Sequence, residues 1–212
     1  EPMRSELPPA GYLEGVKDLA KAHDAILIFD EISCGFRMAI GGVQDYLGVT
    51  PDMTVISKSM SNGYPMGAVV GSREVMEPAK RMFISSQYWS DITGIVAALT
   101  TIRELKKRNA QARFKDTGEK LRAALNGAIT NSGISGKCAG VDANPVLTLD
   151  VPEGVDGRKV STLFIQEMAK QGVHCQMSFK ATLAHSSEDI ALTGKAATQA
   201  LSIIKKGLDS DR

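Results

Sequence analysis

The chain has 212 residues, of which 43% are hydrophobic and 23% charged, and its formal net charge is +1. This balance is typical of a folded globular protein, and a net charge so close to zero gives no basis for nucleic-acid or membrane-surface binding. No apolar run approaches the length of a membrane span, no signal peptide is visible, and the cysteines and histidines lack metal-ligand spacing. The composition therefore predicts a cytoplasmic protein with reduced thiols and without a metal centre.

The first half of the chain alternates helical and strand-like patterns. Apolar residues at helical spacing predict a helix over residues 12–23, which His23 ends. Short apolar runs over residues 25–29 and 53–57 predict strands that are buried on both faces of a parallel sheet. Residues 68–70 predict an edge strand, and the apolar stripe over residues 92–105 predicts a helix with one buried face. This alternation predicts an α/β sheet.

The second half predicts a smaller α+β domain. The expected elements are a helix over 112–130, a loop over 131–144, a strand over 145–151, a helix over 158–171, a strand over 173–177 and a last helix. Ser186 and Asp189 form a capping-box pattern at the start of the last helix, and Gly172 stops the helix before it. The boundary near Asn109 divides the chain into domains 1–108 and 109–212.

A charged residue follows each of the two buried strand patterns, namely Asp30 and Lys58. Ligands bind outside the carboxyl ends of the strands in open α/β sheets, so both side chains are expected at one edge. A lysine that bonds to pyridoxal phosphate works with a carboxylate that keeps the ring nitrogen protonated, and partial burial helps such a lysine shed its proton. Alternatively, Asp30 caps a turn and Lys58 is a solvated loop residue. Spacing alone favours this second interpretation, because charges at strand ends are common.

Arg37 and the glycine pair Gly41-Gly42 lie between these strands, and each has two possible interpretations. The planar guanidinium of Arg37 can bind a substrate carboxylate or phosphate with two hydrogen bonds. Alternatively, Arg37 forms a structural ion pair near the site. Gly41 and Gly42 suit a phosphate cradle, although adjacent glycines more often form a simple turn.

A longer series of motifs carries a family resemblance. It comprises Leu-Ile-Phe-Asp-Glu-Ile-Ser-Cys-Gly-Phe-Arg at 27–37, Gly-Gly-Val-Gln at 41–44, Gly-Val-Thr-Pro-Asp at 48–52, Ser-Lys at 57–58 and Gly-Tyr-Pro-Met-Gly at 63–67. In this order the motifs resemble the class III aminotransferases of pyridoxal-phosphate fold type I. The Gly-Phe-Arg form looks most like the glutamate-1-semialdehyde aminomutase branch. The resemblance implies the remainder of a large, mostly parallel α/β domain, including its linking helix, followed by a small α+β domain.

The resemblance also implies roles for single residues. Asp30 would pair with the pyridine nitrogen, Ile32 would pack on one ring face, and Lys58 would form the internal aldimine and shuttle protons. A threonine before an aromatic residue contacts the cofactor phosphate of the neighbouring subunit in this family. Gln87 stands at that position here, and its amide differs in length. Ser86 is therefore a second candidate for the phosphate contact.

Members of the family are homodimers with composite active sites, and they are roughly twice as long as this chain. The chain starts with Glu-Pro, which in the family follows a strand inside the large domain. The resemblance therefore implies a C-terminal half, and the missing N-terminal half would carry the glycine-rich phosphate loop. A processed or separately encoded subunit is the alternative.

The implied function is pyridoxal-phosphate-dependent transfer of an amino group from an amino-acid donor to an aldehyde or ketone, such as a semialdehyde or sugar acid. An aminomutase of the glutamate-1-semialdehyde type is one alternative. A non-catalytic fragment or partner subunit is another. A nucleotide-binding α/β module that uses Asp30 for a ribose ranks lower, because the chain has no Gly-x-Gly-x-x-Gly motif.

Overall fold

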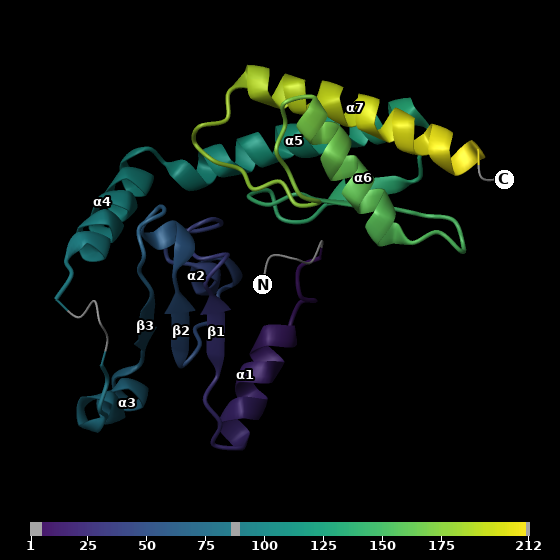
Figure 1. Cartoon of the computed structure of the whole chain (residues 1–212). Helices are drawn as coiled ribbons and strands as arrows, with labels where there is room; N and C mark the ends of the chain where they lie inside the picture. Colours follow the sequence, from purple (N-terminus) through teal and green to yellow (C-terminus); the bar gives the residue numbers. More distant parts are fainter. Residues whose placement is uncertain (1–5, 86–89, 211–212) are drawn as a thin grey trace. The chain divides into compact units, whose positions relative to one another are not determined.

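The computed structural model describes residues 6–85 and 90–210. These residues separate into two compact units (Figure 1). The first contains residues 8–111, and the second contains residues 112–210 together with Glu6 and Leu7. Equating these units with the expected domains 1–108 and 109–212 of a larger enzyme stays a prediction.

The first unit is a three-stranded sheet with short helices between its strands. Its elements in chain order are α1 Tyr12–Ala22, β1 Ile28–Glu31, α2 Val43–Leu47, β2 Met53–Ile56, the 3-10 helix η1 Lys58–Met60, β3 Ala68–Gly71, α3 Arg73–Met76, the 3-10 helix η2 Glu77–Arg81 and α4 Thr93–Lys107. The expected helix and strands are all present, with ends displaced by up to a few residues. His23 caps the C-terminus of α1, as predicted.

The sheet has the strand order β1-β2-β3 (Figure 1). β1 runs parallel to β2, with Asp30 opposite Val55. β3, the predicted edge strand, runs antiparallel to β2. Asp52 fixes the parallel register from the loop side, because its Oδ2 accepts a hydrogen bond from the Leu27 amide at 2.8 Å. The mixed α/β architecture expected from the sequence is confirmed.

The expectation that the strands are buried on both faces is wrong for the described residues. Ile26, just before β1, is 55% exposed, and Ile28 on β1 is 51% exposed. A sheet of three short strands has two edges and two faces. The described part of the chain does not cover all of this surface. Apolar side chains that would be buried within a larger sheet are therefore exposed to solvent.

The apolar stripe of α4 is also open rather than buried. Ile92, Ile95, Val96 and Leu99 are each at least half exposed, and we call these four residues the α4 stripe. The buried residues of α4 are instead Gly94 and Ala98, which a 3.6-residue turn places on another side of the helix. A Cβ at Gly94 would lie 2.9 Å from the Pro65 carbonyl oxygen, so the helix uses its small residues to approach this loop closely.

The second unit packs three helices and a strand pair around one core. Its elements are α5 Ala110–Ser132, which begins two residues before the unit, β4 Gly136–Ala139, β5 Val146–Leu149, α6 Gly157–Lys170 and α7 Ser187–Ser210. Leu125, Phe164, Met168 and Leu201 are almost completely inaccessible at the centre of this core. Within residues 6–85 and 90–210, no helix combines the length and hydropathy needed to cross a bilayer.

Two sequence expectations in this unit are wrong. Residues 131–144, expected to form a loop, contain β4, which pairs antiparallel with β5. Gly136 permits this pairing, because a Cβ there would lie 2.5 Å from the Thr148 carbonyl oxygen. Residues 173–177, expected to form a strand, contain no regular strand. A single isolated bridge joins Ser178 to Val146 beyond their end.

Candidate functional site

The candidate site lies at the carboxyl ends of β1 and β2. Asp30 lies within β1 rather than after it, and Lys58 opens η1 two residues after β2 ends. Because β1 and β2 are parallel neighbours, both side chains belong to the same edge of the sheet. This is the edge at which ligands bind in open α/β sheets.

The Asp30 carboxylate is exposed and turns toward its own backbone. Its Oδ1 accepts a hydrogen bond from the Ile32 amide at 3.0 Å. Among the described residues, no group donates to the second oxygen, Oδ2. The local bond matches the turn-capping interpretation of Asp30, whereas the remaining oxygen leaves an acceptor for a ligand. Ile32 itself is half-buried, and its contact with a ligand ring stays a prediction.

Lys58 has an unusual backbone conformation with φ of 47°. This left-handed region is rare for residues other than glycine, and it costs on the order of 1–2 kcal/mol. The Lys58 Nζ donates a hydrogen bond to Ser33 Oγ in the loop after β1. The side chain is exposed in this chain, so the partial burial expected from the sequence is not present.

Ser33 is the site residue that the sequence analysis missed. It is 7% exposed and lies in the turn between β1 and α2. A single serine after a strand carries no spacing signal. Only the parallel pairing of β1 and β2 places it beside Lys58.

Further serine hydroxyls fix the loops around Lys58. Ser59 Oγ donates to the Gly35 carbonyl at 2.8 Å, and Ser57 Oγ donates to the Met66 carbonyl at 2.7 Å. These bonds tie η1 to the loop after β1 on one side and to the loop before β3 on the other. The backbone around Lys58 is therefore held from two directions.

The glycine pair at the start of α2 serves a structural purpose. Glu31, which is 2% exposed, accepts hydrogen bonds from the Val43 amide at 2.8 Å and the Gln44 amide at 3.4 Å. A Cβ on Gly42 would lie 2.5 Å from Glu31 Oε2, and Gly42 has φ of 84°. The first amides of α2 thus already bind a carboxylate, and Gly41-Gly42 is a turn that admits Glu31 rather than a phosphate cradle.

Arg37 stabilises the loop after β1. Its Nε donates to the Ser33 carbonyl at 2.8 Å, and burial lowers the pKa of its guanidinium. In the described part of the chain no carboxylate forms an ion pair with it. Its binding of a substrate carboxylate or phosphate stays a prediction.

Ser86 and Gln87, the two candidates for a phosphate contact, lie outside the described residues. Asp30, Ile32 and Lys58 lie at or just after the ends of neighbouring parallel strands. The roles predicted for all five residues toward a cofactor stay predictions.

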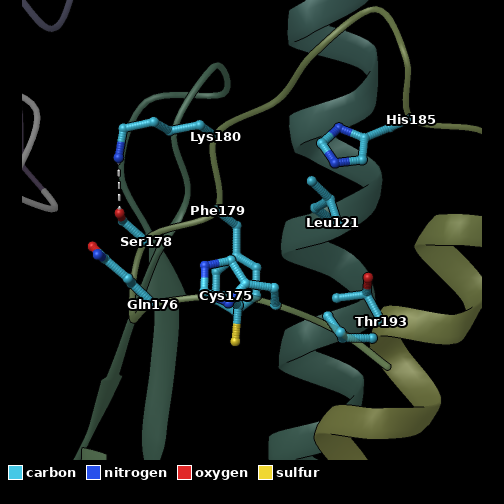
Figure 2. Close-up of a pocket in the computed structure, with 10 residues that line it drawn as sticks. Leu121, Cys175, Gln176, Ser178, Phe179, Lys180, His185 and Thr193 are labelled. Carbon is cyan, nitrogen blue, oxygen red and sulfur yellow. Dashed lines mark hydrogen bonds between the residues drawn. The ribbon is translucent and has the colours of Figure 1, made fainter. Parts of the chain in front are cut away.

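A separate hollow of about 340 Å³ lies within the second unit (Figure 2). Figure 2 shows Lys180 reaching toward Ser178, to which its Nζ donates at 3.2 Å, while His185 and Thr193 lie on the other side. His185 Nδ1 accepts from the Thr182 amide at 3.1 Å. Burial raises the pKa of the Cys175 thiol in this hollow to about 11, which makes it a poor nucleophile at neutral pH.

The chain is similar to a known family and to several known proteins. The family model described as aminotransferase class-III matches residues 3–207. The 3-aminobutyryl-CoA aminotransferase of Cloacimonas acidaminovorans is 34% identical over 96% of this chain and 50% of its own length. The glutamate-1-semialdehyde 2,1-aminomutase 2 of Brevibacillus brevis is 32% identical over 92% of this chain and 48% of its own length. The chain thus spans about half the length of these curated relatives.

Solved structures share the fold along almost the whole chain. The FumI protein of Sphingopyxis sp. MTA144, solved as its PLP internal aldimine form, superposes with a TM-score of 0.87 over 99% of this chain and 52% of its own, at 23% identity. An omega-transaminase from Sphaerobacter thermophilus superposes with a TM-score of 0.82 over 96% of this chain and 51% of its own, at 24% identity. These likenesses support the fold-type I architecture predicted from the motifs. The family model and the relatives above 30% identity show that the chain belongs to the class III aminotransferase family.

Proposed function

We propose that this chain carries the lysine and the carboxylate of a pyridoxal-phosphate-dependent aminotransferase. One observation carries the proposal. In a chain of the class III family, Asp30 and Lys58 stand at the carboxyl ends of two neighbouring parallel strands. That placement suits a ligand held between a carboxylate and an amine.

The residues that the structure describes fit pyridoxal phosphate at two points. Lys58 offers an exposed primary amine whose position is fixed by its backbone and by Ser33. Asp30 offers an exposed carboxylate oxygen that no described residue uses. The remaining requirement, contacts to the phosphate, falls partly to Ser86 or Gln87 and to segments that this chain does not span.

Each residue then has a distinct task. When bound, pyridoxal phosphate supplies the carbonyl that reacts with amines and the ring that withdraws electrons from a substrate carbon. Lys58 would bind the cofactor covalently and move a proton at Nζ. The Asp30 carboxylate would accept a hydrogen bond from the ring nitrogen and keep it protonated. Ile32 would pack against one face of the ring.

The proposed reaction moves an amino group from an amino-acid donor to an aldehyde or ketone acceptor, for which a semialdehyde or sugar acid is our candidate. An aminotransferase and an aminomutase both stand among the relatives, at 34% and 32% identity. The aminomutase reaction of the glutamate-1-semialdehyde type is therefore the second candidate. It uses the same lysine and carboxylate.

We also propose that the part of a longer class III protein that this chain does not span covers the exposed apolar surface of the first unit. Two observations support this: the chain spans about half the length of its relatives, and the sheet and the α4 stripe leave large apolar side chains open. A non-catalytic subunit that requires a separately encoded partner is the competing interpretation. A homodimer with a composite site stays the assembly expected from the family.

Borohydride trapping tests the chemistry directly. The protein is incubated with pyridoxal phosphate, reduced, digested and mapped by mass spectrometry. We expect the pyridoxyl mass mainly on the peptide that contains Lys58. In Lys58→Ala this label disappears while the circular-dichroism spectrum stays that of the parent, because an exposed side chain contributes little to stability.

Lys17→Ala is the matched control, since Lys17 is an exposed lysine on α1. This variant should keep the Lys58 label in full. Label scattered over surface lysines without preference for Lys58 would contradict the proposed function.

A further inference from the structure

The loop after β1 and the helix η1 are joined by two hydroxyl groups that act in opposite directions. Ser33 Oγ, on the loop, accepts from Lys58 Nζ, on η1. Ser59 Oγ, on η1, donates to the Gly35 carbonyl, on the loop, at 2.8 Å. The Ser59 bond links a side chain to the backbone and only connects the two segments. The Ser33 bond, in contrast, binds the amine of the proposed reaction.

Ser33 is itself firmly placed. Its carbonyl oxygen accepts a hydrogen bond from Arg37 Nε at 2.8 Å, and the residue is only 7% exposed. Two residues on, the Gly35 amide donates to the Glu31 carbonyl at 2.9 Å, and a Cβ at Gly35 would lie 2.8 Å from that oxygen. The turn that carries Ser33 is therefore tightly closed and offers a rigid anchor.

Lys58, by contrast, has a long side chain that loses much conformational freedom when it is held. Its left-handed backbone sets the direction of the side chain, and the Ser33 hydroxyl is the only polar side-chain group bonded to Nζ among the described residues. A flexible amine reacts faster when it is kept near the position of the carbonyl.

We propose that Ser33 is a positioning residue, whose hydroxyl holds the Lys58 amine at the edge of the sheet for reaction with the cofactor. This inference rests on the proposed function of Lys58 but assigns a task to a residue outside the predicted site. The hydroxyl accepts a hydrogen bond while Nζ is not bound to a carbonyl. It thereby keeps the amine beside the strand ends.

Three variants of the 212-residue chain test the inference. Ser33→Ala removes the acceptor, and Ser33→Thr restores a hydroxyl at the same position. Ser59→Ala is the matched control, because it deletes a hydroxyl that joins the same two segments without touching Nζ. Thermal unfolding of each variant shows whether the unit remains folded.

Two readouts separate positioning from general damage. The first is the rate of pyridoxal phosphate capture at Lys58, followed by borohydride quenching and peptide mapping. The second uses acetic anhydride without any cofactor and compares acetylation of Lys58 with that of Lys17. Capture depends on where the amine is held, whereas acetylation by a small reagent depends on how freely the amine meets solvent.

In Ser33→Ala we expect capture at Lys58 to slow by about threefold or more, the scale of one lost hydrogen bond. The Lys58-to-Lys17 acetylation ratio should rise, because the amine is released. Ser33→Thr should resemble the parent in both readouts. Ser59→Ala loosens the same two segments without touching Nζ, so it should change both readouts less than Ser33→Ala does. An unchanged capture rate, or a ratio that stays the same or falls, would overturn the role of Ser33.

The two proposals fail in different ways. If the parent chain shows no preferential pyridoxyl label on Lys58, the proposed function fails, and the acetylation ratio still decides whether Ser33 holds the amine. If the parent is labelled at Lys58 and Ser33→Ala equals it in either readout, the role of Ser33 fails alone.

Discussion

Asp30 shows how one carboxylate can serve a backbone and a ligand together. One oxygen accepts from the Ile32 amide, and the other has no donor in the described part of the chain. A capping residue needs only the first oxygen, whereas a partner for a ring nitrogen needs the second as well as a negative charge. The two interpretations therefore predict different consequences of removing the charge alone.

Asp30→Asn makes this distinction, because asparagine keeps an oxygen for the Ile32 amide but is neutral. Under the proposed function, we expect unchanged thermal stability and a fall in the transamination rate on the order of 10² or more, the scale of one lost electrostatic contact to a reacting group. The rate is measured with the amino donor that the parent protein uses best. Near-parental turnover would show that Asp30 only caps the turn.

At the scale of elements, capping side chains determine where helices begin. α7 begins with the capping box predicted from its sequence. Ser186 Oγ accepts from the Asp189 amide at 3.1 Å, and Asp189 Oδ2 accepts from the Ser186 amide at 2.8 Å. The Ser186 hydroxyl also donates to Asp189 Oδ2, at 2.9 Å. The bonds that the carboxylate accepts, first from the backbone amide and then from the hydroxyl of Ser186, hold the pKa of Asp189 below its ordinary value. Its contribution to stability is therefore present above the ordinary aspartate pKa and is lost as the pH falls through the lowered one.

Ser186→Ala should lower the free energy of unfolding by about 1 kcal/mol at neutral pH, since it removes the acceptor for one helix amide. Ser187→Ala is the matched control, because Ser187 is the exposed first residue of the helix and takes no part in the cap. Urea titration followed by circular dichroism measures both. Equal stability of the two variants would show that the cap contributes nothing.

At the scale of the whole molecule, the distribution of apolar surface differs between the units. The second unit buries a continuous core, whereas the first leaves the α4 stripe and parts of its sheet exposed. Exposed apolar surface of this kind promotes association. Under the proposal above, this open surface is what the remaining part of a longer family protein would cover.

We expect the chain on its own to associate in a concentration-dependent manner and to bind an apolar fluorescent dye. Placing lysines at Ile95 and Leu99 should reduce both effects, because charges oppose burial of the stripe. Thr100→Lys adds charge at another exposed position of α4 and serves as the control. Light scattering coupled to gel filtration measures association. A parent chain that stays monomeric at every concentration would contradict this prediction.

The sequence determined the local elements and the family, because both are written in short-range patterns. Helical spacing predicted α1, α5, α6 and α7, and Ser186 with Asp189 predicted the cap of the last helix. The motifs over residues 27–67 identified the class III family, which the family model confirms. Asp30 and Lys58 stood out because a strand end and a charge are visible in the sequence.

Only the tertiary structure decided which surfaces meet and which partners the side chains take. β4 depends on pairing with β5, and Gly136 matters because the Thr148 carbonyl approaches it. The α4 stripe has helical spacing whether or not anything covers it, so periodicity could not reveal that Gly94 and Ala98 make the contact instead. Ser33 and Lys58 are 25 residues apart and carry no shared motif. Their hydrogen bond exists because parallel pairing of β1 and β2 brings the ends of both strands to the same edge.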